Sequence, residues 1–596
     1  MNRDSLLRFL GIAGVGLLVW YFFSGKGGGE ALGTAIKSEA LVIPSSRPEP
    51  ATCTVDGDRF HAELSTRSAA VKRLWLDGAK YTVDGSAKGV PMDVVTTPDH
   101  EEFQPLAAML RAPGADGQIA FDVVDWQVAE KTGKSCTFTY EDERVSLTKV
   151  VRAAGHPFEL ESELRVKNKL EGKAKHRATW ESTSWRYAKE VEGGLGRQSP
   201  FLTTVECVVD GKLVEKSASD FSPKDLAKPE YRDGWFTAEG KVDFAATSNF
   251  YFAQALVPLE GPGAPACQLQ VWERGVKDSA DAGALYRSRL AWPVKELGAG
   301  ETATYKLLMF SGPKEREVLA TAAGGQHNLS ELIKLGRLAV IAKVLVAFLI
   351  WVKTHVGSWG VAIILLTLAV RTVLFPLTWK QIKSGAAMRR LKPEIDALNA
   401  KYKDDAQQKQ LATMELYRKR GVNPFTGCLP VVAQMPVWFA LYTSLQTAAE
   451  LYHTPFLWFR DLSAPDTIHI GSWDLPFLLP ILLGATTFVQ QKLMPQQMDP
   501  AQQKMMTYMM PAVFTAMMLF LPAGLGVYMF TNSVLGIAQT LAVERYYANQ
   551  PPVGGGDGGG IEVREKGDGP KGDETTRGAA GKGPAALPLG KGKARV

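Results

Sequence analysis

An arginine inside an apolar segment is the chain's most unusual feature. Arg371 lies within "GVAIILLTLAVRTVLFPLT", residues 360–378, which is long enough to cross a bilayer. Arginine stays protonated in proteins, and at the centre of a membrane helix it costs ~2.5 kcal/mol or more. Such residues usually mark polar pathways or binding sites. The sequence therefore predicts that Arg371 is a functional residue of a membrane-embedded site.

An acidic partner for Arg371 is missing from the apolar segments. We place these segments near 359–378, 425–447, 475–493, 506–521 and 523–543, and none of them contains Asp or Glu. Glu544 follows directly after the last segment and is the structural alternative as an ion-pair partner. Without such a pair, a water-filled cavity is the expected way to solvate the charge.

Uncharged polar residues accompany the arginine. Thr367 and Arg371 are four positions apart and so share one helical face. Gln434, Gln490, Asn532 and Gln539 lie in the later segments. Taken singly, each is expected to bond a neighbouring helix. Together with a lone arginine they indicate a hydrophilic groove.

Composition divides the rest of the chain into regions. Residues 1–23 carry two arginines before an apolar run that ends in Trp-Tyr-Phe-Phe, which favours an uncleaved membrane anchor over a removed signal peptide. Residues 24–49 read as a flexible linker. Residues 50–325 contain short alternating stretches, such as "FELESELRVKN" at 158–168, which predict strands. We expect a large exported all-β sandwich domain there.

Cys53, Cys136, Cys207 and Cys267 fall in the predicted β domain. One or two disulfides are chemically allowed if the domain is exported, and the sequence does not choose among the three full pairings. Free buried thiols are the alternative.

Residues 330–353 contain Lys334 and Lys343 within an apolar pattern, which predicts an interfacial amphipathic helix. The core follows at 354–546. Its loop 380–421 has eleven Lys/Arg and five Asp/Glu, whereas loop 448–474 has one basic residue and four acids. The positive-inside rule places 380–421 in the cytoplasm. We therefore expect six spans, cytoplasmic termini and an exported β domain.

Loop 380–421 has the pattern of a helical hairpin. Apolar residues from Met388 to Tyr402 step three and four positions, and Leu411, Met414 and Tyr417 offer a matching edge on the returning segment. Arg389, Arg390 and Lys392 give the hairpin a basic face. That face is either simply solvated or meets ribosomes and targeting factors. Residues 547–596 form a Gly/Pro-rich basic tail that is expected to be disordered. It either stays solvated and keeps the terminus inside, which is the default expectation, or touches ribosomal RNA or anionic lipid.

Enzyme motifs are absent from the sequence. It contains no G-x-x-x-x-G-K-[ST], no H-E-x-x-H and no G-x-S-x-G, and its eight histidines are scattered outside the predicted spans. We therefore expect no catalytic residues, no metal site and no cofactor. The protein is expected to act by providing an environment rather than by performing chemistry.

Several segments together resemble the YidC/Oxa family of membrane protein insertases, in its long Gram-negative form. The resemblance is strong over about 330–546 and weaker in the β domain. It is carried by "VRTVLFPLT", "MRRLKPEIDAL", "GVNPFTGCLPVVAQMPVWFALY", "PFLWFRDLSAPD", "DPAQQKMMTYMMPAVF" and "LPAGLGVYMFTNS".

The resemblance implies a bacterial inner-membrane insertase and chaperone that acts alone or beside the Sec translocon on nascent membrane proteins. It implies that Arg371 lies in a hydrophilic groove, that Gln434 matches a groove position and that Tyr528 matches a substrate-contact site. Where the family motif has a second tyrosine, this chain has Met529. It also implies an exported β-supersandwich that resembles sugar-binding folds, from which we infer no sugar binding.

Two other functions fit part of the pattern. A small-anion transporter would use Arg371 as its binding site, but the spans show no matching halves of the kind that inverted repeats produce. A non-catalytic anchor for the β domain would leave the polar groove residues and the basic hairpin without a purpose.

Overall fold

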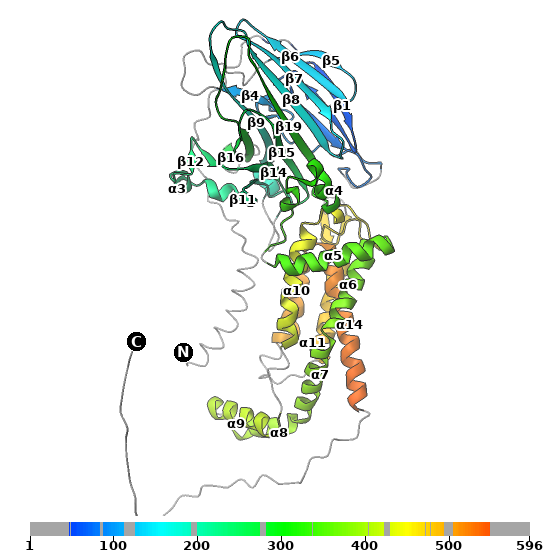
Figure 1. The fold of residues 1–596 in the computed structure, drawn as a ribbon. Coiled ribbons are helices and arrows are strands. Elements are labelled where there is room, and N and C mark those ends of the chain that lie inside the picture. Colours follow the sequence, from blue (N-terminus) through cyan, green and yellow to red (C-terminus); the bar gives the residue numbers. More distant parts are fainter. Residues whose placement is uncertain are drawn as a thin grey trace, which may run out of the picture. The chain divides into compact units, whose positions relative to one another are not determined.

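The structure, a computed structural model, describes residues 47, 49–83, 88–111, 125–191, 199–274, 282–336, 338–402, 405–421, 429–470, 473–476, 478–493 and 505–548 (Figure 1). The predicted anchor at 1–23 lies outside the described residues, as do nearly all of the linker and of the tail at 547–596. The backbone of Arg389 is described, but its side chain is not.

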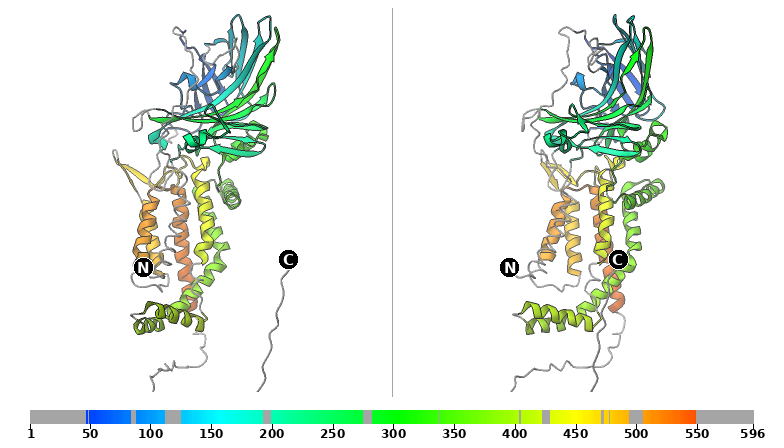
Figure 2. Two further views of the ribbon diagram at one scale, coloured as in Figure 1. Left: turned by 90° about the vertical axis from the view of Figure 1, so that its left-hand side faces the viewer. Right: turned by 60° about the vertical axis from the view of Figure 1, so that its left-hand side comes forward.

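Antiparallel sheets make up the first half of the described chain (Figures 1 and 2). One sheet has the strand order β11-β10-β14-β15-β19-β8-β7-β6-β5, a second has β12-β13-β16-β17-β9-β18 with β4 paired to β9, and a third has β1-β2-β3. The strands are β1 (Thr52–Gly57), β2 (Phe60–Ser65), β3 (Ala70–Leu76), β4 (Ala108–Arg111), β5 (Gln127–Lys131), β6 (Ser135–Glu141), β7 (Val145–Ala153), β8 (Glu159–Asn168), β9 (Ala174–Tyr187), β10 (Thr204–Val209), β11 (Lys212–Lys216), β12 (Tyr231–Arg232), β13 (Trp235–Ala238), β14 (Val242–Ser248), β15 (Phe252–Glu260), β16 (Ala266–Arg274), β17 (Gly283–Ala291), β18 (Lys295–Leu297) and β19 (Thr302–Pro313).

The two large sheets share one hydrophobic core. Leu256 and Phe310 of the nine-stranded sheet belong to the same buried cluster as Val271 and Leu290 of the other sheet. Strand β8 shows why the sequence folds this way: Leu160, Ser162, Leu164 and Val166 are all buried, and exposed residues alternate with them toward its end. A strand turns alternate side chains to opposite faces, so this pattern buries one face. The predicted β-sandwich is confirmed.

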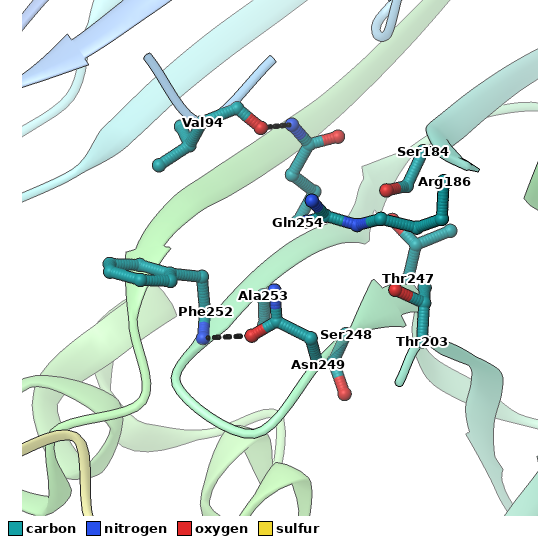
Figure 3. A pocket seen from close by; sticks show the side chains of 10 residues that line it. All are labelled: Val94, Ser184, Arg186, Thr203, Thr247, Ser248, Asn249, Phe252, Ala253 and Gln254. Carbon is teal, nitrogen blue, oxygen red and sulfur yellow. Dashed lines mark hydrogen bonds between the residues drawn. The ribbon is translucent and has the colours of Figure 1, made fainter. Parts of the chain in front are cut away.

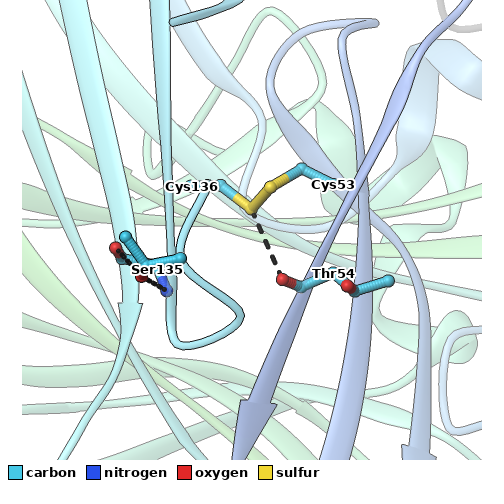
Figure 4. Close-up of a disulfide and its surroundings, with 5 residues drawn as sticks. Cys53, Thr54, Ser135 and Cys136 are labelled. Atoms are coloured by element: carbon cyan, nitrogen blue, oxygen red, sulfur yellow. Dashed lines mark hydrogen bonds between the residues drawn. A yellow bond between two sulfur atoms is a disulfide. The ribbon is translucent and has the colours of Figure 1, made fainter. Parts of the chain in front are cut away.

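Disulfides join strands of different sheets. Cys53 of β1 pairs with Cys136 of β6, with a Cα–Cα distance of 6.2 Å (Figure 4). Cys207 of β10 pairs with Cys267 of β16, at 6.6 Å. Of the three pairings that the sequence left open, the structure contains this one. Each bond therefore links two of the sheets covalently.

A lysine is fully buried in the β domain. Lys149 of β7 donates hydrogen bonds from Nζ to the carbonyl oxygens of Ala69 at 2.8 Å and Leu106 at 2.6 Å. Both of these residues have positive φ angles, 46° and 66°. Two carbonyls solvate an ammonium ion less well than water does, and burial lowers the pKa of Lys149 to about 7.

The second half of the described chain is helical. Its longer helices are α5 (Ala339–Val356), α6 (Trp359–Val373), α7 (Phe375–Arg390), α8 (Lys392–Lys401), α9 (Ala406–Lys419), α10 (Leu429–Gln446), α11 (Leu478–Leu493), α13 (Met510–Met518) and α14 (Ala523–Ala548). Shorter elements are α2 (Ala188–Val191), α3 (Pro223–Leu226), α4 (Arg316–Thr321), the π-helix Met505–Met509, the hairpin of β20 (Thr467–Ile470) with β21 (Trp473–Pro476), and the 3-10 turns Glu101–Phe103, Ala218–Phe221, Ala322–Gly325, Leu329–Leu332 and Ala449–Leu451.

The helix predicted at 330–353 is displaced along the chain. A 3-10 turn occupies Leu329–Leu332, Gly336 has a φ of 68°, and α5 begins only at Ala339. It ends at Gly357, whose left-handed backbone donates to the carbonyl oxygen of Lys353. The prediction was wrong in its boundaries, because the chain turns at Gly336 before the regular helix starts.

By length and composition alone, two described helices are long and apolar enough to cross a membrane, Ala339–Val356 and Ala523–Tyr546. A third counts if α6 and the start of α7, which meet at a 63° bend, form one span. Yet α5 runs across α6 and α10 rather than along them (Figures 1 and 2). Its location at the membrane surface therefore stays a prediction.

Replacing both Cys207 and Cys267 by serine is expected to destabilise the β domain. The bond spans 60 positions of the chain, so its loss increases the conformational entropy of the unfolded state. The free energy of unfolding should fall by about 2–5 kcal/mol. Urea unfolding of the full chain, followed by tryptophan fluorescence, measures the change. A reductant breaks Cys53–Cys136, so it should destabilise this variant further. It should not change the stability of a variant in which all four of these cysteines are replaced.

The burial of Lys149 predicts a pH dependence. Its folded pKa of about 7 lies below the unfolded value, so between roughly pH 7 and pH 10 the unfolded chain binds more protons. The free energy of unfolding should therefore rise with pH across this window, by up to about 1.4 kcal/mol per pH unit from this residue. Lys149→Met should reduce the slope, whereas the same change at exposed Lys212 should not. An unchanged slope in Lys149→Met would contradict the assignment.

Candidate functional site

Helix α6 positions Arg371 on a buried face. The helix starts after Ser358, whose hydroxyl accepts a hydrogen bond from the N–H of Val361. Thr367 is fully buried and Arg371 is 9% exposed, so the two share the inward face, as their spacing predicts. Thr367 Oγ1 donates to the carbonyl oxygen of Ile363 at 2.7 Å, within its own helix. Arg371 lies two residues before the helix ends and the chain bends into α7.

The guanidinium of Arg371 is bound by α14. Its Nε donates to Asn532 Oδ1 at 2.6 Å, Nη2 donates to the Asn532 carbonyl oxygen at 2.6 Å, and Nη1 donates to Gln539 Oε1 at 3.2 Å. These acceptors are uncharged. Among the described residues no carboxylate lies within ion-pair distance of Arg371, so hydrogen bonds solvate the charge but leave it unneutralised.

Protein oxygens take part in solvating the arginine, for which the sequence predicts a water-filled cavity. With 9% exposure and three bonds to α14, most of its donors face protein oxygens. The polar residues of the last predicted span supply these oxygens. Asn532 was predicted as a groove residue, but not as the direct partner of Arg371.

Gly536 makes room for the guanidinium. A Cβ at this position would lie 2.7 Å from Arg371 Nη2 and 3.1 Å from Gln490 Nε2. Gln490 belongs to α11, so three helices converge at this point. Gly536 was not predicted as a site residue. A glycine inside a helical pattern, away from any turn, was the available signal of a close approach.

A second polar pair lies one helical turn away on α14. Gln434 of α10 donates through Nε2 to the hydroxyl of Tyr528, which is 1% exposed. Tyr528 and Asn532 are four residues apart and therefore share a face of α14. The structure thus brings Arg371, Gln434, Tyr528 and Asn532 to one side of α14, while Thr367 bonds neither pair.

The predicted hairpin consists of α8 and α9, which pack through Leu391, Ile395, Leu416 and Tyr417. Leu411 and Met414, expected in this seam, are 65% and 47% exposed. The contact surface of α9 passes through residues 416 and 417 instead, so that part of the prediction was wrong. The side chains of Arg390 and Lys392 are exposed. Arg420 pairs across the hairpin with Glu394 at 2.9 Å.

Comparisons with known proteins identify both halves. Residues 351–550 match the family model described as 60Kd inner membrane protein, and residues 52–348 match the YidC periplasmic domain. The protein named membrane protein insertase YidC of Anaeromyxobacter sp. (strain K) is 34% identical over 526 residues, covering 85% of this chain and 87% of that protein. The chain belongs to the family of YidC membrane protein insertases.

Other YidC relatives agree. The YidC of Pelobacter propionicus is 43% identical over 250 residues, 41% of this chain and 45% of that protein. Among solved structures, a galactose mutarotase-like protein from Lactobacillus casei covers 44% of this chain and all of its own length, with 10% identity and a TM-score of 0.29. A TM-score this low supports no statement about fold or ligand.

Membership of the YidC family sets the location of the chain. The β domain corresponds to the matched periplasmic domain, and the family resides in the bacterial inner membrane. The family is a class of insertases, not of enzymes. The Arg371 site lies in the segment that matches the 60Kd inner membrane protein model.

Enlarging Gly536 should weaken the helical core of this YidC relative. A side chain there displaces the guanidinium from its acceptors on α14, and hydrogen bonds to charged groups contribute about 1.5–3 kcal/mol. Gly536→Val should therefore unfold at a lower SDS fraction when the full chain in detergent micelles is titrated. Ala538→Val, at an exposed position of the same helix, is the matched control. Equal losses in the two variants would refute the steric argument.

Proposed function

We propose that this chain inserts and folds inner-membrane proteins, alone or with the Sec translocon, through a hydrophilic groove along α14. The groove would include Arg371, Thr367, Gln434, Tyr528 and Asn532. Family membership supports the insertase function. The hydrogen bonds that join Arg371 to Asn532 and Gln434 to Tyr528 support the position of the groove.

One observation carries the proposal: Arg371 is solvated by neutral oxygens and keeps its charge. A client segment with acidic or polar residues faces a cost of several kcal/mol when it enters hydrocarbon. An uncompensated cation part-way across the membrane lowers this cost by attracting the client's carboxylates. Transfer of the client's apolar helix into lipid then supplies the driving force without ATP.

The topology that suits this function has six spans. They are the anchor at 1–23, the bent pair formed by α6 and the start of α7, α10, α11, the π-helix Met505–Met509 together with α13, and α14. In this arrangement α5 lies at the periplasmic surface of the membrane. The excess of basic residues in 380–421 puts the hairpin and both termini in the cytoplasm.

The cytoplasmic parts would recruit the clients. Exposed Arg390 and Lys392 lie where α7 gives way to α8, and Arg389 is their neighbour in sequence. This basic group, with the basic tail at 547–596, suits ribosomal RNA, targeting factors or anionic lipid headgroups as partners. The alternative of a small-anion transporter is not favoured by the family match.

Arg371→Ala is expected to slow insertion of a short two-helix client with acidic residues in its translocated segment. Without the guanidinium, the client's carboxylates lose charge-assisted hydrogen bonds that contribute about 1.5–3 kcal/mol. This corresponds to about tenfold or more in rate. Arg371→Lys keeps the charge but loses the planar guanidinium that reaches Asn532 and Gln539 together, so its rate should be intermediate. Cells depleted of the wild-type chain, with protease protection of the client, measure the effect.

Arg545→Ala is the matched control, because Arg545 is an exposed arginine near the end of α14. It should insert the client at the wild-type rate. A client whose acids are replaced by amides should depend less on Arg371. Full insertion of the acidic client by a folded Arg371→Ala variant would refute the groove mechanism. Unchanged insertion with impaired uptake of small anions would support the transporter instead.

A further inference from the structure

A tight turn between α10 and α11 exposes two large apolar side chains. The N–H groups of Phe456 and Phe459 each donate to the other's carbonyl oxygen, at 3.0 and 2.9 Å, so Leu457 and Trp458 form the tip of the turn. Leu457 is 72% exposed and Trp458 is 40% exposed. Leu457 also has a φ of 54°, a left-handed conformation that costs about 1–2 kcal/mol for a residue with a Cβ. A strained leucine presented to solvent points to a function for this tip.

The turn is held against the first residues of two helices of the core. The ring of Phe456 packs on Gly360, at the start of α6, where a Cβ would lie 2.1 Å from the ring. Beyond the turn, the carbonyl oxygen of Leu462 accepts from the N–H of Gly524 at 2.8 Å, at the start of α14. The tip formed by Leu457 and Trp458 is therefore fixed at the level where α6 and α14 begin.

Trp458 is bonded to the start of a third helix. Its Nε1 donates to Asp466 Oδ2 at 3.4 Å, and the same oxygen accepts from the N–H of Leu479 in the first turn of α11, at 2.7 Å. The polar edge of the indole is thus directed to the protein, although the side chain as a whole stays 40% exposed.

The segment before the turn is packed on the β domain. The ring of Tyr452 lies 5.0 Å from that of Tyr251 and 5.3 Å from that of Phe252. Asn249 closes the chain reversal that presents these two rings, because its Oδ1 accepts from the N–H of Phe252 at 2.9 Å (Figure 3). Contacts on both sides of the turn therefore restrain it, so its exposure is a property of an ordered loop.

A free cation follows the apolar tip. Arg460 is exposed, and it forms no ion pair or hydrogen bond among the residues that the structure describes. The neighbouring Asp461 accepts from the N–H and hydroxyl of Ser463 instead, at 2.7 and 2.8 Å. An exposed leucine and tryptophan next to an unpaired arginine are typical of the membrane interface, where indole rings lie at headgroup level and guanidinium binds phosphate.

We propose that Leu457 and Trp458 insert into the periplasmic leaflet of the membrane and that Arg460 binds a lipid phosphate. The inference rests on the topology proposed above, in which α6 and α14 begin at the periplasmic surface. Lipid is the occupant that fits best, because a stable protein partner covers about 800 Å² on each side and a two-residue tip offers far less.

The anchor also sets the depth of the Arg371 site. Gly360, on which the turn packs, precedes Arg371 by eleven residues of the same helix. At 1.5 Å per residue this is a rise of about 17 Å, and the hydrocarbon core is about 30 Å thick. A tip fixed at the periplasmic boundary therefore holds the guanidinium near the middle of the bilayer.

A dye attached to the tip measures its depth. Leu457→Cys is combined with Cys428→Ser, so that the other four cysteines, which are paired, leave one thiol to label with the fluorophore NBD. The full chain is placed in nanodiscs of phosphatidylethanolamine and phosphatidylglycerol that carry a doxyl quencher at acyl carbon 5 or 12. We expect blue-shifted emission and stronger quenching by the shallow quencher. Val294→Cys, at a 42% exposed apolar residue of the β domain, is the control and should emit as in water without quenching.

The role of Arg460 has its own readout. A quencher on anionic phosphatidylglycerol should act more strongly on the tip than the same quencher on neutral phosphatidylcholine. One basic residue near the surface corresponds to about fivefold local enrichment of anionic lipid. Arg460→Gln should remove this preference and keep the blue shift. A preference that persists in Arg460→Gln overturns the phosphate contact.

Emission from position 457 that equals emission from position 294 overturns the anchor. So does a dye that is exposed to water in nanodiscs but shielded in native membrane vesicles, because a protein partner then covers the tip. Trp458→Cys, labelled in the same way, gives the reading if the first variant does not fold. The measurement needs no client, so a dye in water leaves the insertase proposal intact, and a failed insertion assay leaves the anchor intact.

Discussion

A permanent charge inside an apolar helix has to find acceptors, and the helical half of this protein is arranged around that requirement. Arg371 cannot release its proton, so the neighbouring helices have to bring oxygens to it. Helix α14 does so with residues that step four, four and three positions along one face: Tyr528, Asn532, Gly536 and Gln539. Two of these residues accept from Arg371, one makes space for it, and one receives Gln434.

The site was partly readable from the sequence because one of its residues is so costly. An arginine is rare in an apolar segment, and the lack of acids in the predicted segments argued against an ion pair. Its partner was harder to identify. Several polar residues were equally plausible as its partner, and only the packing of α6 against α14 identifies Asn532. Gly536 was harder to recognise from the sequence, because glycine occurs inside helices for many different reasons.

The fold was predictable where the pattern is local. In β8 the alternation of residues fixed both the strand and its buried face. Properties that depend on contacts between distant segments were not predictable. The pairing of Cys207 with Cys267 follows from two sheets meeting face to face. The seam of α9 shifted to Leu416 and Tyr417 for the same reason, because several apolar edges of a helix can face a partner and only the packing chooses one.

The choice of neutral acceptors around Arg371 has a functional consequence. A carboxylate on α14 would bind the guanidinium more strongly than Asn532 does, and it would cancel the positive field that an arriving acidic segment meets. Amide oxygens satisfy the geometry of the donors while the net charge persists. The structure therefore keeps a cation that no carboxylate among the described residues neutralises. Such an arrangement agrees with the proposed groove, which has to attract charge from outside.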